Sequence, residues 1–443
     1  MKRQLVILLV LSALVSCQRD PFFSFENQDP SGNAASWAVK PRVESEETRN
    51  VMLLYSAGFN SLARYLDKNI VELEEGFIPE KSTRADHILL VYSKLTARGE
   101  DGSCLLDYKV PTKSALFRMY KKDGQVVKDT IKVWGEDVIA SDPETLRDVC
   151  QTVYNRFPAK GYGIVFTSHA SGWLPSGYYN DPNAYEKNST IWRKSVSGGR
   201  NQWSYPAIEP SYPAVKSLGQ DNIPGAPVEM ELDAFAAAIP FHLDYLLLDA
   251  CLSGCVEVAY QFKGKADIVG FSQAEVLAEG FNYKTITSRL LQQNPDPVQV
   301  CKDYFAQYDS ETASNPYATI SAIDTREMEP LASVCKTLFD KYRNKLKTMG
   351  SYGIQGYYRY DRHFFYDLKD VLVKAGITEE EESALQDALD RCVIYKAATD
   401  YFISFKIKTA CGLSMYLPSM GSELLDEFYL NHLAWNGATL LVK

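Results

Sequence analysis

The chain has fewer basic than acidic residues, and it lacks several common sequence motifs of metal and nucleotide sites. Its 443 residues include 47 Lys and Arg against 56 Asp and Glu, a net charge of −9, with the basic residues dispersed. A nucleic-acid-binding surface needs clustered bases, so we expect no nucleic-acid partner. HExxH, a Gly-rich phosphate loop and the EF-hand pattern are all missing, which argues against a metalloenzyme or a nucleotide-binding protein.

The cysteines lack the paired spacing of a zinc site. A chain of this length can bury a full core without disulfides, even if it is exported. We therefore expect the thiols that follow Cys17 to be mostly free and buried. They are Cys104, Cys150, Cys251, Cys255, Cys301, Cys335, Cys392 and Cys411.

The N-terminal segment has the pattern of an export signal. Two basic residues precede an apolar run at residues 5–15, which is too short to span a membrane, and Leu-Val-Ser-Cys at residues 14–17 closes it. That ending resembles a bacterial lipobox, which implies cleavage before Cys17 and acylation of its thiol. The alternative is simple export as a soluble product. Residues 18–48 lack periodicity and are predicted to be a flexible tether. We expect an exported protein, lipid-anchored at the outer membrane or cell surface of a Gram-negative bacterium.

In the body of the chain, apolar runs alternate with amphipathic ones. Helical patterns, such as the one at residues 141–157, separate the strand-like runs. Apolar strands divided by helices are typical of a parallel sheet covered on both faces, so we predict an α/β sandwich. The strand-like runs lie at residues 51–57, 87–93, 114–120, 161–169, 244–251 and 267–272.

Two regions depart from this alternation. Residues 174–228 show no clear elements, which in a compact domain indicates a functional or disordered segment. Residues 325–443 are mainly helical, and the pattern predicts that one helix spans residues 378–397. We therefore expect a core at residues 49–324 that contains the long insertion, with the C-terminal region packed on it.

Two of the predicted strands end in residues that could carry out nucleophilic chemistry. Among five histidines, His169 alone directly follows a strand and precedes small, turn-prone residues, and Cys251 has the equivalent place after its own strand. Ligands of open parallel sheets bind beyond the carboxyl ends of the strands. If these strands are neighbours, the imidazole can serve as the base for a thiolate nucleophile in acyl transfer. The alternative for Cys251 is a small buried hydrophobic residue.

The segments around these two residues resemble the signatures of the clostripain family (C11) of caspase-like, clan CD cysteine peptidases. They read TSHASGW at residues 167–173 and DACL at residues 249–252, and the similarity extends over about residues 50–437. The resemblance implies a caspase-like α/β/α sandwich with a mostly parallel sheet. It also implies a thioester acyl-enzyme, with His169 as general acid/base and Cys251 as nucleophile.

By the same resemblance, the backbone N–H groups of Ala170 and Cys251 hold the oxyanion. The family usually has Asn and Gly where this chain has Ser168 and Ala170. If the backbone at residue 170 needs a positive φ, the alanine is strained.

Acidic residues accompany the thiol. Asp249 and Cys251 are two apart on an extended strand, so their side chains point the same way. The resemblance implies that Asp249 pairs with the basic residue before the scissile bond, most often Arg and in some cases Lys. Glu275 and Glu279 could form a second wall of that pocket. The alternatives are an acid at a helix N-terminus for Asp249 and solvated loop acids for the two glutamates.

The insertion contains Lys187, Arg193, Lys194 and Arg200, which an Arg- or Lys-selective enzyme could cut in its own chain. We therefore expect self-activation by cleavage there.

For the enzyme as a whole, we expect a peptide or protein substrate with Arg or Lys at the cleavage site, a monomer, and no required cofactor. Calcium dependence occurs in part of the family. A second hypothesis is an inactive surface lipoprotein whose 28 Tyr, 20 Phe and 6 Trp bind glycans or proteins.

Overall fold

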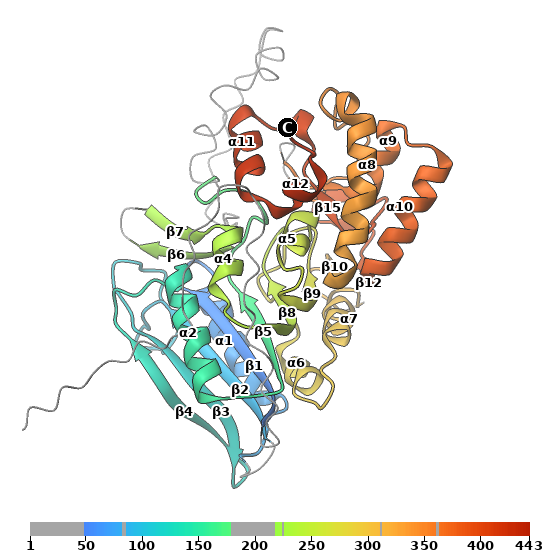
Figure 1. Cartoon of the computed structure of the whole chain (residues 1–443). Coiled ribbons are helices and arrows are strands. Elements are labelled where there is room, and N and C mark those ends of the chain that lie inside the picture. Colours follow the sequence, from blue (N-terminus) through green and yellow to red (C-terminus); the bar gives the residue numbers. More distant parts are fainter. Residues whose placement is uncertain (1–47, 82–85, 179–217, 224–225, 311, 360–362) are drawn as a thin grey trace, which may run out of the picture. The chain divides into compact units, whose positions relative to one another are not determined.

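Nine strands form the central sheet of the computed structural model, in the order β12-β10-β9-β8-β5-β1-β2-β3-β4 (Figure 1). The structure describes residues 48–81, 86–178, 218–223, 226–310, 312–359 and 363–443. All of these residues belong to one compact unit, Ala38–Lys443.

Five parallel strands occupy the middle of the sheet. Their side chains are apolar on both faces. In β1, for example, Val51 and Leu53 belong to one hydrophobic cluster, while Met52 and Leu54 belong to the other. This alternation follows from the two-residue period of a strand, and it confirms the predicted sheet with two covered faces. The five strands are β1 (Thr48–Gly58), β2 (Asp86–Leu95), β5 (Gly161–Thr167), β8 (Leu243–Asp249) and β9 (Ala266–Phe271).

Antiparallel strands extend both edges of this parallel centre. On one side β3 (Ser114–Lys122) pairs with β2, and β4 (Gln125–Trp134) pairs with β3. The β3–β4 turn consists of Asp123 and Gly124, both with positive φ, which is the preferred geometry of a two-residue hairpin. On the other side β10 (Thr319–Asp324) pairs with β9.

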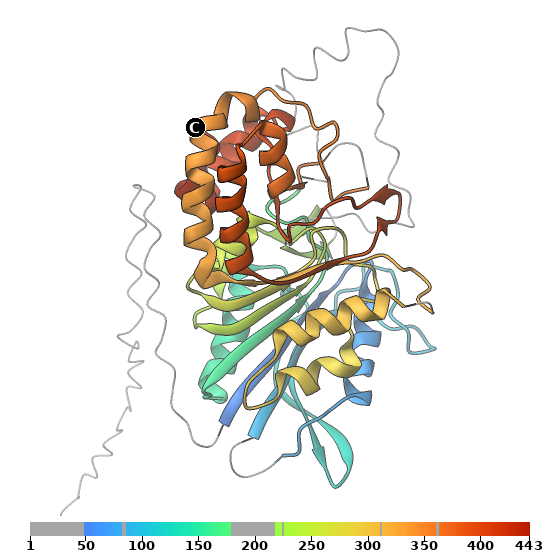
Figure 2. The ribbon, with the colours of Figure 1, turned by 90° about the vertical axis from the view of Figure 1, so that its right-hand side faces the viewer.

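Helices cover the two faces of the sheet (Figure 2). The prediction of a helix at residues 141–157 is confirmed by α2, in which the Asp142 side chain caps the N-terminus and Pro143 is the first residue. One face carries α1 (Ala63–Glu75), α6 (Tyr283–Leu290) and α7 (Pro297–Tyr308). The other carries α2 (Pro143–Arg156), α4 (Leu232–Ala238) and α5 (Val256–Gln261).

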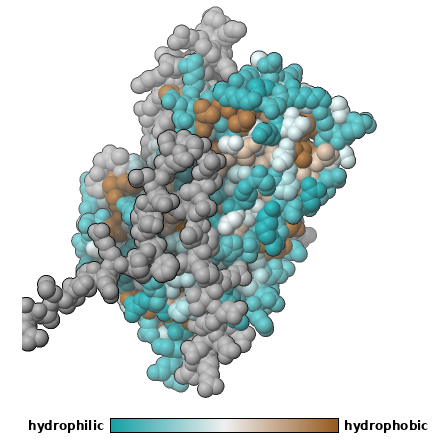
Figure 3. Space-filling model, in the orientation of Figure 1, coloured by the Kyte–Doolittle hydropathy of each residue, from teal (hydrophilic) through white to brown (hydrophobic). Residues whose placement is uncertain are grey.

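The C-terminal region adds a helical layer beside α5. Hydrophilic residues cover most of its visible surface, and hydrophobic residues appear there in small groups (Figure 3). Its helices are α8 (Met328–Leu346), α9 (Leu368–Ala375), α10 (Glu379–Cys392), α11 (Glu423–His432) and α12 (Ala434–Thr439). Its short strands outside the central sheet are β11 (Tyr366–Asp367), β13 (Tyr401–Phe402), β14 (Phe405–Lys406) and β15 (Ser414–Met415).

One prediction for this region is wrong in part. The helix expected at residues 378–397 ends at Cys392, and the next six residues form β12 (Val393–Ala398), which pairs with β10 at the edge of the central sheet. The strand begins with Val, Ile and Tyr, which favour β-structure, and the edge of β10 offers partners for their backbone groups. Sheet pairing therefore prevails over the helical pattern.

A second difference lies at the end of the predicted insertion. Strands β6 (Leu218–Ile223) and β7 (Ala226–Met230) form a hairpin there. The buried carboxylate of Asp221 holds the hairpin to the core, because it accepts hydrogen bonds from the backbone of Ala140 and Ser141 and forms an ion pair with Lys94 at 3.4 Å. Such polar anchoring produces no apolar alternation, which is why the sequence pattern missed it.

Several predictions concern residues outside the described part. They are the lipid anchor Cys17 and the candidate cleavage sites Lys187, Arg193, Lys194 and Arg200. Within the described ranges, no helix is long and apolar enough to cross a membrane. All eight cysteines expected to be free and buried are so, which confirms that prediction.

Candidate active site

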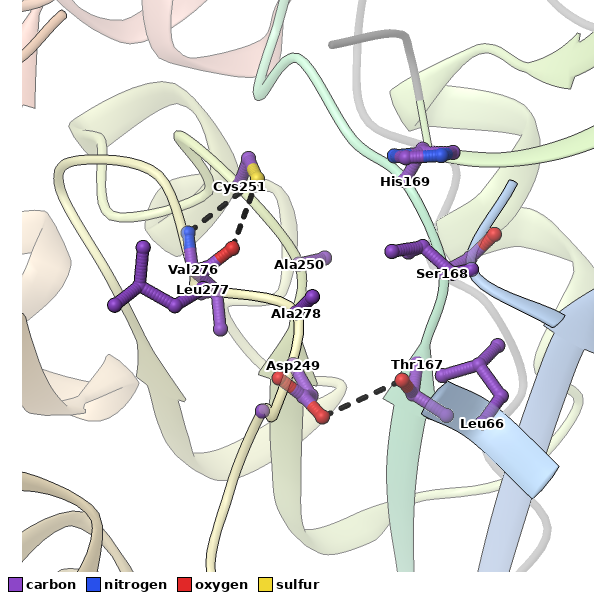
Figure 4. Close-up of a pocket in the computed structure, with 12 residues that line it drawn as sticks. Leu66, Thr167, Ser168, His169, Asp249, Ala250, Cys251, Val276, Leu277 and Ala278 are labelled. Carbon is purple, nitrogen blue, oxygen red and sulfur yellow. Dashed lines mark hydrogen bonds between the residues drawn. The ribbon is translucent and has the colours of Figure 1, made fainter. Parts of the chain in front are cut away.

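A pocket lies beyond the carboxyl ends of four neighbouring strands, β1, β5, β8 and β9. Thr167 at the end of β5 stands opposite Asp249 at the end of β8. His169 and Cys251 each follow two residues later, so the neighbouring strands deliver both to the same pocket, and Figure 4 shows them on opposite sides of it. The prediction that these strands are neighbours is confirmed. The lining residues are Leu62, Leu66, Thr167, Ser168, His169, Asp249, Ala250, Cys251, Val276, Leu277, Ala278 and Gly280.

The Cys251 thiol is hydrogen-bonded to the loop that follows β9. The backbone N–H of Val276 donates to Sγ at 3.3 Å, and Sγ lies 3.6 Å from the carbonyl oxygen of the same residue. Burial, with a smaller contribution from the Glu275 carboxylate, raises the pKa of the Cys251 thiol to about 12. The sulfur is therefore protonated near neutral pH, and a base must remove its proton before it can act as a nucleophile.

The chain turns sharply after Cys251. Leu252 has φ of 57°, an unusual conformation for a non-glycine residue, and its N–H donates to the carbonyl of Ala274. Opposite it, Gly172 has φ of 64°, and a Cβ added to this glycine would lie 2.4 Å from the carbonyl oxygen of Leu252. Glycine is strongly favoured at residue 172, since this φ strains any other residue and the Leu252 oxygen obstructs a Cβ there.

Ala170 is not among the residues with positive φ, so the strain that such a φ would impose on an alanine is absent. The alanine that this chain has, where the family resemblance leads us to expect glycine, therefore does not have to adopt a left-handed backbone. Ser168 stands where the family resemblance leads us to expect asparagine. Its hydroxyl donates to the carbonyl of Ala57 at 2.7 Å and accepts from the backbone N–H of Gln220 at 3.1 Å. The segment before His169 is thus held at both sides.

The His169 imidazole is buried, with 1% of the residue exposed, and its Nε2 lies 2.9 Å from Oγ of Ser61. Ser61 comes from the loop between β1 and α1, and the sequence analysis did not identify it. A polar residue just past an apolar strand was the only available signal. The carbonyl of His169 accepts a hydrogen bond from the N–H of Gly219 in β6 at 3.0 Å, so the β6–β7 hairpin holds the backbone of the histidine.

Asp249 forms part of the pocket lining below the thiol (Figure 4). Its Oδ2 accepts hydrogen bonds from the Tyr283 hydroxyl at 2.6 Å, from Thr167 Oγ1 at 3.3 Å and from the Phe281 N–H at 3.4 Å. Among the residues that the structure describes, Oδ1 has no hydrogen-bond partner. Burial raises the pKa of Asp249 to about 6, and these donors oppose the rise. Helix α5 begins only at Val256, so Asp249 is not an N-terminal acid of that helix.

The two glutamates expected beside Asp249 lie in different surroundings. Glu279 is exposed, between the lining residues Ala278 and Gly280, at the rim of the pocket. Glu275 does not line the pocket, and its buried carboxylate instead forms an ion pair with Arg359 at 2.8 Å. Burial raises the pKa of Glu275 to about 7, and Arg359 opposes the rise. The placement of Glu275 in the pocket wall is therefore corrected, because its charge is already neutralised elsewhere.

The other four histidines lie away from the pocket, as expected. His87 is in β2, His242 lies 3.0 Å from Asp267, and His432 lies 3.2 Å from Asp233. His363 is buried, which lowers its pKa to about 4. Within the described residues, no group of three or more His, Cys, Asp or Glu side chains is arranged to hold a metal ion.

Comparisons with known proteins identify the family and the fold of this chain. A model of the clostripain family matches residues 204–436, more than half of the chain, a range that contains Cys251 and begins after His169. An inactive zymogen C11 protease from Parabacteroides distasonis, known from its X-ray structure, is 26% identical with a TM-score of 0.68, and the match covers 90% of this chain and 99% of that one.

A secreted C11 cysteine protease from Bacteroides thetaiotaomicron, solved with an irreversible peptide inhibitor, is 22% identical with a TM-score of 0.68. The match covers 88% of this chain and 99% of that one, and it shows the shared fold. The comparison with curated proteins finds no match. The family model and the shared caspase-like fold together establish that this chain belongs to the clostripain family and is a cysteine peptidase.

Proposed function

We propose that the enzyme hydrolyses peptide bonds after basic residues, with Cys251 as nucleophile and His169 as general acid/base. One observation carries the proposal: an imidazole, a thiol and a buried carboxylate line one pocket at the carboxyl ends of two strands in register. The thiol and imidazole supply the chemistry of acyl transfer, and the carboxylate supplies a negative charge for a cationic side chain.

The reaction proceeds in two halves. His169 takes the thiol proton as the sulfur of Cys251 attacks the scissile carbonyl carbon, and it then passes that proton to the leaving amine, so that a thioester remains. Water next attacks the thioester and gives a proton to His169, which returns it to the sulfur as the acid product leaves. The backbone N–H groups of Cys251 and Ala170 are our candidates for stabilising the oxyanion in both halves.

The environment of Asp249 favours lysine over arginine before the scissile bond. Three protein donors already converge on Oδ2, so the carboxylate presents chiefly Oδ1 to the pocket. A guanidinium pairs best with two carboxylate oxygens, whereas an ammonium needs only one. The apolar side chains of Leu62 and Leu66 also line the pocket and can contact the methylene stem of either residue. This preference differs from the arginine preference that the family resemblance implied.

The test is hydrolysis of matched fluorogenic peptides that differ only in Lys, Arg or norleucine before the cleaved bond, under reducing conditions. We expect Lys to be cleaved fastest and norleucine slowest, with no turnover by Cys251→Ala or His169→Ala. Preferred cleavage of norleucine would refute the basic specificity, and full activity of either variant would refute the assigned catalytic pair.

Self-processing is a separate part of the proposal. The relative from Parabacteroides distasonis is described as an inactive zymogen, and we propose that the present enzyme matures by cleavage after Lys187, Arg193, Lys194 or Arg200. Wild-type protein and Cys251→Ala should be compared on a denaturing gel. Fragments from the wild type alone are expected, and an identical intact band from both would exclude self-processing.

We also propose that the enzyme is exported and anchored by a lipid on Cys17. Metabolic labelling with a fatty acid should mark the wild type but not Cys17→Ala, and equal labelling of both would exclude this anchor. Because Cys251 and His169 supply both nucleophile and base, we propose that catalysis needs no cofactor. Activity should then survive EDTA, and recovery by added calcium after a loss in EDTA would contradict this part.

A further inference from the structure

We propose that Ser61 is a positioning residue for catalysis, which holds the His169 imidazole through Nε2 and stabilises its protonated form. This inference rests on the proposed function, because it gives Ser61 a role only if His169 transfers protons. The observation behind it is the 2.9 Å contact between Oγ of Ser61 and Nε2 of His169.

The sheet brings these two residues together. Strand β1 lies beside β5 in parallel register, with Ser56 opposite Thr167, and the chain then continues from β1 into the loop that contains Ser61. His169 leaves β5 at the same edge. The two side chains are 108 residues apart in the chain, so the contact depends on the order of the strands.

The loop that carries Ser61 is fixed by its neighbour Asn60, whose side chain is fully buried. The Asn60 amide donates to the carbonyls of Ala57 at 2.9 Å and Gln220 at 2.8 Å, and its oxygen accepts the N–H of Leu62 at 2.8 Å. The Asn60 amide nitrogen Nδ2 also donates to Oγ of Ser168, the residue before His169, at 3.3 Å. Asn60 therefore ties the backbone of the Ser61 loop to the histidine segment, and the exposed Ser61 residue is held beside His169 by that loop.

The chemistry of a proton-transferring imidazole explains the use of a hydroxyl here. When His169 takes the thiol proton, both ring nitrogens carry hydrogen, and Nε2–H then donates to the Ser61 oxygen. A hydrogen bond to a charged group is stronger than one between neutral groups, so this contact strengthens as the imidazolium forms. It also fixes the rotation of the ring. The other titratable side chains that line the pocket with His169 are Asp249 and Cys251.

The test compares Ser61→Ala with Ser61→Thr, which keeps the hydroxyl, on the fluorogenic substrate that the wild type cleaves best. Losing one charge-assisted hydrogen bond should lower kcat about tenfold with KM little changed. It should also move the acidic limb of the pH profile of kcat/KM to lower pH, since the protonated imidazole is less stabilised. Ser61→Thr should recover most of the activity, and Ser333→Ala, in an exposed turn of α8, should match the wild type.

The outcomes separate this inference from the function on which it rests. Wild-type activity that survives in His169→Ala would refute the proposed function itself. An active wild type and an inactive His169→Ala, together with a Ser61→Ala variant of wild-type kcat and pH profile, would refute only the role of Ser61. Equal losses in Ser61→Ala and Ser61→Thr, with the same pH profile as the wild type, would show that packing and not the hydroxyl matters, and would also overturn it.

Discussion

The change Asp249→Asn tests the electrostatic basis of substrate choice most directly. The two side chains have nearly the same shape, so the substitution removes the negative charge from the pocket without creating a cavity. The amide oxygen of Asn can still accept the hydrogen bonds that Tyr283, Thr167 and Phe281 now make to Oδ2. The variant then differs from the wild type chiefly in the charge offered to a bound substrate.

The magnitude follows from the burial of the carboxylate, since Asp249 is only 5% exposed. Removing one partner of a buried ion pair typically costs about 3–5 kcal/mol, because the other charge is left without compensation. At about 3 kcal/mol, and with 1.36 kcal/mol for each factor of ten, kcat/KM for a lysine substrate should fall roughly 150-fold. A norleucine substrate has no charge to compensate, so its kcat/KM should change little.

The assay measures kcat/KM of both proteins on the lysine and norleucine peptides near neutral pH. The decisive quantity is the ratio between the two substrates, which should collapse in Asp249→Asn. The unfolding temperature is the control, and we expect no fall, because burial raises the pKa of Asp249 and its ionised form therefore opposes folding above pH of about 6. Equal losses on both peptides would refute the reasoning, and an unchanged ratio would show that the cation binds elsewhere.

Three further predictions follow from the same structure. Acidification through pH of about 6 should lower the preference for lysine over norleucine, because the Asp249 carboxylate becomes protonated and neutral; a preference that is constant across this range would contradict its role. Gly172→Ala should lower the free energy of unfolding, measured by denaturant titration, by more than the roughly 1–3 kcal/mol of backbone strain, because a backbone oxygen also obstructs the new Cβ. The control is Gly353→Ala, where φ is positive but the space is open, so only the effect of the strain should appear. Arg359→Ala should lower the free energy of unfolding by about 3–5 kcal/mol, and adding Glu275→Gln should restore part of that loss. If the effects of the two substitutions simply add in the double variant, the pair is not coupled.

Local patterns were sufficient to identify the parallel centre of the sheet and the main candidate residues. The apolar runs of β5 and β8 each end in a short polar or small-residue turn, and this signal lies within a few residues of His169 and Cys251. The capped start of α2 was equally local, because Asp142 and Pro143 adjoin the helix they begin.

Contacts between distant segments were not predictable in this way. Glu275 reads as a loop acid like Glu279, and only the fold brings Arg359 to it. The contact of Ser61 with His169 depends on β1 lying beside β5. The end of α10 at Cys392 likewise depends on the free edge of β10, since the helical pattern itself continues further.

The sequence by itself determined the α/β class, the family, and the candidate pair His169 and Cys251, because strand ends and short motifs depend on neighbouring residues in the chain. Tertiary structure alone decided what each side chain meets. Hydrogen bonds and burial are set by through-space neighbours, and these determined that Asp249 presents one oxygen to the pocket and that Cys251 is held protonated. A residue's type limits the chemistry available to it, and the packing of the folded chain determines which part of that chemistry is used.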